Sequence, residues 1–247
     1  MARYWIGTSG WSYANWRGPF YPPGSKAHDW LAFYAQHLCS VEINTTFYRL
    51  PRAAMLAGWH AHTPASFLFA IKAWRVITHF RRLRECDAAL ASFLGAIAPL
   101  AEKAGPVLFQ LPPHFARDAA RLSDFLALLP RGRRFTFEFR DPSWHDDSVY
   151  DVLAEHNAAF CPFELAALAA PRVVTADFIY LRLHGRTARY RGAYTQAALA
   201  DWAAWLSENM AAGRDVYVFF DNTDEADHAV RDALRLERLL DDAARRP

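Results

Sequence analysis

The sequence predicts an α/β fold in which one domain, residues 1–247, closes into a TIM-like (β/α)8 barrel. Short apolar runs alternate with stretches of helical length from one end of the chain to the other. Strands that alternate with helices form a parallel sheet, and eight such units close into a barrel. The length is ordinary for a barrel, and no repeat, low-complexity tract or linker divides the chain. A doubly wound open sheet is the alternative.

The predicted strands are short runs rich in aromatic and branched residues. In chain order they are Tyr4–Gly7, Ser40–Ile43, Phe67–Lys72, Pro106–Leu111, Phe135–Arg140, Ala158–Phe163, Phe178–His184 and Val216–Phe220.

The predicted helices lie between these strands. They are His28–Leu38, Arg52–His60, Asp87–Lys103, Arg117–Leu129, Asp146–His156, Gln196–Ala211 and Glu225–Asp242. Asp146 and Thr195 stand where a side chain caps a helix start, and Gly213 stands where a helix ends. The stretch 164–177, "ELAALAAPRVVTAD", is too short and interrupted for a full crossover helix. We therefore expect an irregular or shortened crossover between strands six and seven.

Composition narrows the class of protein. A formal net charge of +2 argues against nonspecific nucleic-acid binding as the main activity, because that requires a dense basic face. The three cysteines, Cys39, Cys86 and Cys161, are far apart and show no zinc-binding spacing. No motif for an organic cofactor, no signal peptide and no membrane-spanning apolar run is found. The expectation is a soluble cytoplasmic protein; the sequence does not address its oligomeric state.

The segment "FTFEFRDPSW" shows how a site arises on such a barrel. Phe135, Phe137 and Phe139 alternate with polar residues, so the phenylalanines are predicted to face the helices. Glu138 and Arg140 then point into the barrel, close to its C-terminal mouth, where active sites of this architecture lie.

Other strands end in the same way. Groups able to bind or transfer protons stand at or near their ends: Glu42, Asn44, Lys72, Gln110, Arg182, His184, Asp221 and Asn222. Aromatic residues suited to form pocket walls lie in the connecting loops: Trp11, Trp144 and Tyr194. We predict a polar ligand site at the mouth, with a small anionic or sugar-like molecule as its ligand.

Several chemistries fit these residues. In the leading one, Glu138 and His184 form an acid/base pair, while Arg140, Arg182 and Lys72 hold an anion. Asn44, Gln110 and Asn222 then orient the ligand, and no metal takes part. A structural ion pair between Arg182 and Glu42 or Glu138 is equally open.

A divalent-metal hydrolase or isomerase is the second reading of the site. Its ligands would be Glu42, Glu138, His184 and Asp221, although no HxH or HExxH motif supports such a site. The third reading is a noncatalytic ligand-sensing or nucleic-acid-associated barrel.

Seven segments, taken together, resemble one family. They are "IGTSGWSYANWRGPFYP", "VEINTTFYRLP", "FAIKAWRVITH", "GPVLFQLPPHF", "FEFRDPSW", "YLRLHGR" and "VYVFFDNT", in this order along nearly the whole chain. The chain is similar in these segments to the domain-of-unknown-function 72 (DUF72) family of YecE-like proteins.

The resemblance implies a TIM-like barrel but no assigned reaction. It marks the predicted site residues as motif positions, among them Trp11, Glu138 and His184. Two positions depart from the family pattern: Asp221 stands where asparagine is usual, and Glu164 where aspartate is common.

Overall fold

The computed structural model describes residues 2–166 and 168–245. The chain forms two compact units. The first is drawn from Met1–Glu42, Pro162–Ala170 and Asp177–Pro247, and the second from Ile43–Cys161 and Pro171–Ala176. Both are α/β, with mostly parallel strands, as the sequence predicts.

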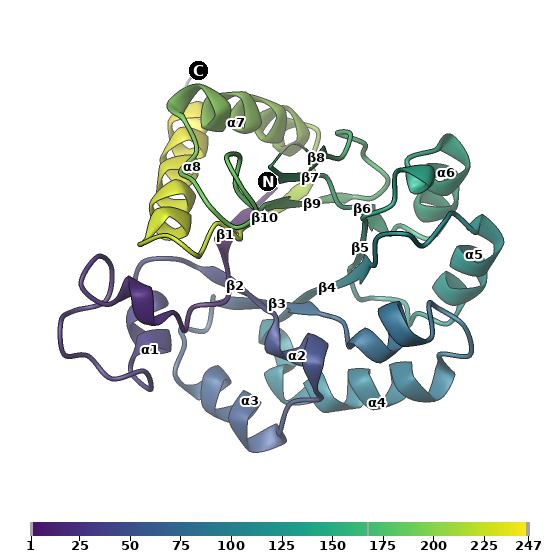
Figure 1. Cartoon of the computed structure of the whole chain (residues 1–247), viewed down its shortest axis with the longest axis horizontal. Coiled ribbons are helices and arrows are strands. Elements are labelled where there is room, and N and C mark those ends of the chain that lie inside the picture. The colour runs from purple at the N-terminus through teal and green to yellow at the C-terminus, as the bar shows by residue number, and fades with distance from the viewer. Residues whose placement is uncertain (1, 167, 246–247) are drawn as a thin grey trace. The chain divides into compact units, whose positions relative to one another are not determined.

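The strands of the first unit run in the order β2-β1-β10-β9-β7-β8 (Figure 1). Their neighbours pair in parallel, except that β7 and β8 form an antiparallel hairpin. The bounds are β1 (Tyr4–Ser9), β2 (Ser40–Ile43), β7 (Phe163–Leu165), β8 (Leu168–Ala169), β9 (Phe178–Leu183) and β10 (Asp215–Phe220). Only the last residue of β2 belongs to the second unit.

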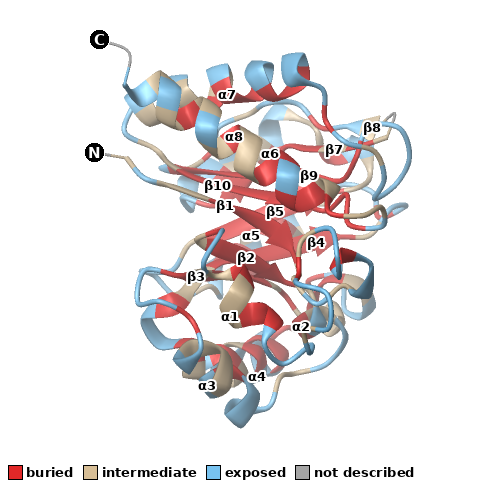
Figure 2. Cartoon of the chain, turned by 90° about the vertical axis from the view of Figure 1, so that its left-hand side faces the viewer, coloured by how far each residue is buried: buried red, intermediate tan, exposed pale blue. Residues whose placement is uncertain are grey.

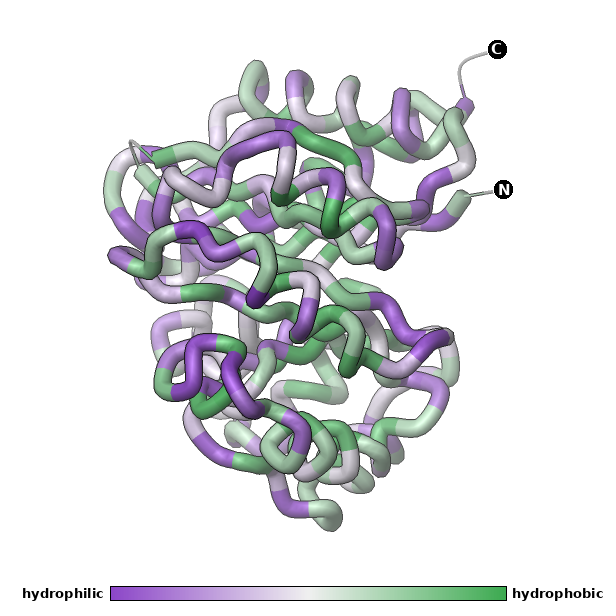
Figure 3. The backbone as a smooth tube through the Cα atoms, turned by 90° about the vertical axis from the view of Figure 1, so that its right-hand side faces the viewer, coloured by the Kyte–Doolittle hydropathy of each residue, from purple (hydrophilic) through white to green (hydrophobic). Residues whose placement is uncertain are grey.

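Two long helices accompany these strands. The predicted cap Thr195 accepts a hydrogen bond from the backbone N–H of Ala198 and starts α7 (Gln196–Ala211). Helix α7 packs on α8 (His228–Ala244), and α8 packs on β1 and β10. Figure 2 shows β9 and β10 of this sheet largely buried. Figure 3 shows hydrophilic and hydrophobic residues alternating along the helices near the C-terminus. The shorter helices are η1 (Ala14–Trp16) and α1 (Trp30–Tyr34).

The strands of the second unit run in the order β6-β5-β4-β3, with the parallel ladders β3/β4, β4/β5 and β5/β6. They are β3 (Leu68–Lys72), β4 (Ala104–Leu111), β5 (Phe135–Phe139) and β6 (Ala159–Phe160). The ring of Phe125, on helix α5, packs edge-on against Phe109 and Phe137. The apolar face of β5 therefore meets a helix, as the alternation in "FTFEF" predicts.

The second unit contains the four predicted helices, of which Asp87–Lys103 is divided into α4 and η3, and three short helices that were not predicted, α2, η2 and η4. In chain order the helices are α2 (Thr45–Tyr48), α3 (Ala53–Ala61), η2 (Val76–Phe80), α4 (Asp87–Ile97), η3 (Ala98–Lys103), α5 (Ala119–Ala127), η4 (Pro142–Trp144) and α6 (Asp147–Glu155). The predicted cap Asp146 accepts a hydrogen bond from the backbone N–H of Ser148 and starts α6. The buried ammonium of Lys103 lies 2.6 Å from His60 O and 2.7 Å from Thr63 O, where it satisfies carbonyls at the end of α3.

The region after β6 differs from the prediction in one respect. The run Ala158–Phe163 was predicted as one strand, but it contains β6 and the start of β7, with Pro162 between them. Proline has no N–H to donate to a sheet ladder, which explains the break.

The predicted irregular crossover after this run is confirmed over the described residues, because the hairpin β7/β8 occupies part of it where a helix would otherwise lie. Part of this stretch, residue 167, lies outside the described residues. None of the described helices is long and apolar enough to cross a bilayer.

Candidate functional site

A buried cluster of charged side chains stands at the strand ends of the first unit. Glu42 comes from β2, Arg182 from β9, and His184 and Asp221 directly follow β9 and β10. Glu42 and His184 are fully buried, Arg182 is 1% exposed, and the side chain of Asp221 is 13% exposed. Solvent therefore reaches this cluster at Asp221.

The Glu42 carboxylate holds the Arg182 guanidinium. Arg182 Nη2 donates to Glu42 Oε1 at 2.7 Å and lies 3.4 Å from Asp221 Oδ2. Ser9 Oγ also donates to Glu42 Oε1, and Tyr180 OH donates to Oε2. Three donors satisfy the carboxylate, which in turn fixes the orientation of Arg182. The structural ion pair that the sequence left open is present, with Glu42 as the partner.

His184 is oriented by two neighbours of opposite charge. Its Nδ1 lies 2.8 Å from Asp221 Oδ2, and its Nε2 lies 3.3 Å from Arg182 Nη1. Because a guanidinium can only donate, Nε2 must be the acceptor in the second contact. The ring proton is then on Nδ1, where it is donated to Asp221. The cluster thus contains a neutral imidazole whose basic nitrogen faces a guanidinium.

Tyr13 extends the cluster and was not predicted. Burial raises the pKa of its phenol, and the charges of Asp221 and Glu42 raise it further, so the hydroxyl stays protonated. That hydroxyl donates to the carbonyl of Ser9. The only signal in the sequence is the polar and aromatic loop after the first strand, which contains Tyr13 but does not single it out.

Two predicted ligand-binding residues of this unit hold the connection between β9 and α7. Tyr194 OH accepts a hydrogen bond from the backbone N–H of Gly185. Asn222 Nδ2 donates to Gly192 O at 2.9 Å and to Asp232 Oδ2 at 3.0 Å. Both side chains are buried, so these hydrogen bonds position the loop that follows His184. Their contact with a ligand stays a prediction.

The second unit holds its own group of predicted residues. The fully buried Glu138 forms an ion pair with Arg140, two residues along the same strand face. Gln110 lies beside Glu138 in the sheet register and donates to Leu111 O. The predicted acid/base pair thus has Glu138 in one unit and His184 in the other, and it stays a prediction.

Lys72, at the end of β3, lies in an aromatic environment. Its Nζ is 4.6 Å from the centre of the Phe47 ring, which also meets the His79 ring edge-on. Burial, together with the charges of Lys72 and two arginines, lowers the pKa of His79 to about 4. His79 is therefore neutral at neutral pH, beside the side chains of Lys72, Arg75 and Arg82.

The remaining predicted residues lie at different depths. Trp144 is fully buried and donates its indole N–H to Phe115 O, and Trp11 is half-buried. The buried amide oxygen of Asn44 has no hydrogen-bond partner among the described residues. Their roles as pocket walls and as an orienting group stay predictions.

The charged cluster of the first unit is built around a guanidinium. Within residues 2–166 and 168–245, no group of three or more histidine, cysteine or acidic side chains is placed to hold a metal ion. Between Glu42 and Asp221 the position that a cation would take is occupied by Arg182. The donor set of this cluster therefore fits an arginine better than a divalent ion.

Comparison with known proteins decides the family. The profile described as "Protein of unknown function DUF72" matches residues 5–247. The chain belongs to the DUF72 family. The resemblance in the seven sequence segments is thereby confirmed.

Related proteins support this assignment along the whole chain. The DUF72 chain is 26% identical to UPF0759 protein YunF of Bacillus subtilis, covering 95% of this chain and 94% of that protein. It is 36% identical to UPF0759 protein YecE of Escherichia coli, over 46% of this chain. That alignment spans less than half of YecE, 42% of its length.

Solved structures show the same fold. The crystal structure of a DUF72 family protein from Thermotoga maritima aligns with a TM-score of 0.83 and 26% identity, covering 97% of this chain and 99% of that one. A DUF72 family protein from Enterococcus faecalis aligns with a TM-score of 0.82 and 21% identity, covering 98% of this chain and 96% of that one. The DUF72 description assigns no activity, so function must be argued from the site.

Proposed function

We propose that this DUF72 protein is a metal-independent enzyme that performs acid/base chemistry on a small anionic or sugar-like ligand. His184 is the central group, and Asp221 orients it. The observation that carries the proposal is the fixed imidazole: Nδ1 is held by Asp221 at 2.8 Å, and Nε2 faces Arg182 at 3.3 Å. Histidine is the side chain best suited to proton transfer near neutral pH.

The two guanidinium nitrogens of Arg182 have separate tasks in this proposal. Nη2 is bound to Glu42, which is itself held by Ser9 and Tyr180, so the guanidinium cannot turn freely. Nη1 lies 3.3 Å from Nε2 of the imidazole, which is long for a hydrogen bond. An anionic oxygen of a ligand is a better acceptor for Nη1 than a neutral nitrogen. When such an oxygen binds, the lone pair of Nε2 is released to accept a proton.

The hydrogen bonds of His184 indicate how a proton would be transferred. The ligand gives a proton to Nε2, and the imidazolium that forms is stabilised by the Asp221 carboxylate. Return of that proton to another position of the ligand regenerates the neutral ring.

The proposal is tested in two steps. A thermal-shift screen of anionic compounds and sugars identifies ligands, since a molecule that binds the folded state raises the melting temperature. Turnover of each hit is then measured for the wild type, His184→Asn and Asp221→Asn. Loss of a general acid/base lowers kcat by a factor of about 10² to 10⁴.

His156→Asn is the control, because His156 is exposed on the end of α6. Full turnover by His184→Asn would remove the basis of the proposal.

A further inference from the structure

The loop between β9 and α7 begins directly after His184 and carries three arginines. Arg186, Arg189 and Arg191 are all exposed, and among the described residues none of them forms an ion pair. Three unneutralised guanidiniums within six residues repel one another, which costs free energy unless an anion offsets the repulsion. Such a loop is a candidate binding element.

The backbone of the loop is fixed by hydrogen bonds to three parts of the first unit. Tyr190 N donates to His184 O at 2.7 Å, and Ala166 N, in the β7–β8 turn, donates to Gly185 O at 2.8 Å. Gly192 N donates to Glu225 Oε2 at 3.0 Å, after β10. The carbonyl oxygen of Gly192 accepts a hydrogen bond from Asn222 Nδ2. The arginines are thus attached to a turn whose backbone is already ordered, so little backbone entropy is lost when a ligand binds.

Two glycines make this turn possible. Gly185 has a φ of +97°, and a Cβ added there would lie 2.2 Å from Arg191 O. Gly192 has a φ of +84°, and a Cβ there would lie 2.3 Å from Thr187 Oγ1. Only glycine fits both the left-handed conformation and the close approach. The two arms of the loop are therefore in direct contact.

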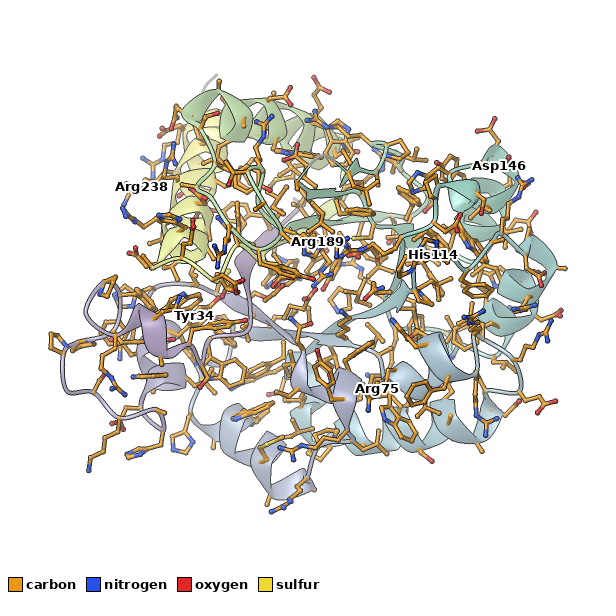
Figure 4. The ribbon with its side chains drawn as sticks, in the orientation of Figure 1. Tyr34, Arg75, His114, Asp146, Arg189 and Arg238 are labelled. Atoms are coloured by element: carbon orange, nitrogen blue, oxygen red, sulfur yellow. The ribbon has the colours of Figure 1, made fainter. Side chains whose placement is uncertain are left out.

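The loop also touches the catalytic cluster. The ring of Tyr190 packs edge-on against the His184 ring, with centroids 5.9 Å apart. In Figure 4 Arg189 lies over the strand ends, whereas Arg238 lies on the outer flank of α8. A ligand held by the arginines would consequently lie next to the cluster that contains His184.

The cluster holds charges of both signs, because Glu42 and Asp221 are carboxylates and Arg182 is a guanidinium. The exposed arginines of the loop add positive charge next to this cluster. An anion that binds at Arg182 would therefore meet further guanidiniums in the adjacent loop.

We propose that Arg186, Arg189 and Arg191 bind the phosphate group of the substrate, which is a small phosphomonoester. The assignment rests on the proposed function, because it names the substrate class of the His184 site. A phosphomonoester dianion offers three terminal oxygens, and guanidinium forks match them in pairs. The net charge of +2 over the chain argues against a nucleic-acid backbone as the ligand.

Calorimetric titration of the full chain with inorganic pyrophosphate tests the assignment, with acetate at equal ionic strength as the anion control. The variant R186Q/R189Q/R191Q is expected to bind pyrophosphate at least about 100-fold more weakly, since each charge-assisted hydrogen bond contributes about tenfold or more. Arg238→Gln is the matched control, because it removes an exposed arginine of the same unit and should leave binding unchanged. Each single loop variant should weaken binding by about tenfold.

Three results would overturn the assignment. They are unchanged pyrophosphate binding by the triple variant, an equal loss in Arg238→Gln, and binding by the wild type of a single-stranded oligonucleotide but not of pyrophosphate. Circular dichroism confirms that the triple variant is folded.

His184→Asn separates the two proposals. If His184→Asn keeps pyrophosphate binding and loses turnover of a screened phosphomonoester, both stand. If binding does not depend on the arginines while turnover still depends on His184, only the loop assignment fails. If binding depends on the arginines while His184→Asn turns over normally, only the catalytic proposal fails.

Discussion

Replacing Arg182 by methionine is the sharpest test of the charged cluster. The substitution keeps most of the buried volume but removes the cation that lies 2.7 Å from Glu42 and 3.4 Å from Asp221. Breaking a buried ion pair on one side costs about 3–5 kcal/mol of unfolding free energy, because the other charge stays buried. Glu42 keeps its hydrogen bonds from Ser9 and Tyr180, so we expect a value near the low end, about 3 kcal/mol.

Urea unfolding of four proteins measures this cost: the wild type, Arg182→Met, Glu42→Gln and the double variant. In the double variant the paired charges disappear together, so it should be more stable than the sum of the single effects predicts, by at least about 1 kcal/mol. Arg231→Met is the surface control. Its guanidinium is 59% exposed in the pair with Asp227, so stability should change by no more than about 0.5 kcal/mol.

The reasoning is refuted if Arg182→Met costs less than about 1 kcal/mol and its effect adds to that of Glu42→Gln, since contacting charges should be energetically coupled. Such a result would mean that the guanidinium does not hold the two carboxylates in solution.

Three further predictions concern other parts of the protein. Lys103→Met leaves buried carbonyls unsatisfied and should lower the unfolding free energy by about 1–3 kcal/mol. Lys26→Met, at an exposed position, should leave it unchanged. Equal effects of the two substitutions would contradict the role of Lys103 as a donor to buried carbonyls. Gly185→Ala should speed amide hydrogen exchange in the loop after β9 far more than Gly24→Ala does near residue 24. Both glycines have a positive φ, but only at Gly185 would an added Cβ clash with neighbouring atoms. Similar effects of the two substitutions would argue against the close contact. His79 has a lowered pKa, about 4, so the unfolded state binds the extra proton and stability should fall as the pH drops from about 6.5 toward 4. His79→Gln should flatten that dependence in unfolding experiments at several pH values, and an unchanged slope would contradict it.

Strand periodicity and helix caps could be predicted from the sequence for physical reasons. Period-two alternation in "FTFEF" fixed which face of β5 meets α5, and the side chains of Asp146 and Thr195 cap helices where they were expected. The split of the sixth strand was missed because Pro162 was counted within a single apolar run. Proline interrupts a ladder, and its position in this run was the available signal.

The candidate site was predictable only in part. The strand register brings Arg182 and His184 to one face, so their proximity follows from sequence. Which carboxylate pairs with Arg182 depends on side chains that are far apart in the chain, and the prediction left Glu42 and Glu138 open. Tyr13 was missed because it lies in a loop with no periodic pattern.

The arginine loop was missed for a different reason. Its three guanidiniums stand out only when the structure shows that, among the described residues, none has an ion-pair partner.

The central claim is that Asp221 and Arg182 hold His184 as a neutral imidazole with its proton on Nδ1. Nitrogen NMR of protein labelled at histidine, with His184 assigned through His184→Asn, reports the protonation of each ring nitrogen directly. At neutral pH we predict a protonated Nδ1 and an unprotonated Nε2 for this residue. A proton on Nε2, alone or together with one on Nδ1, would contradict the arrangement on which the proposed chemistry depends.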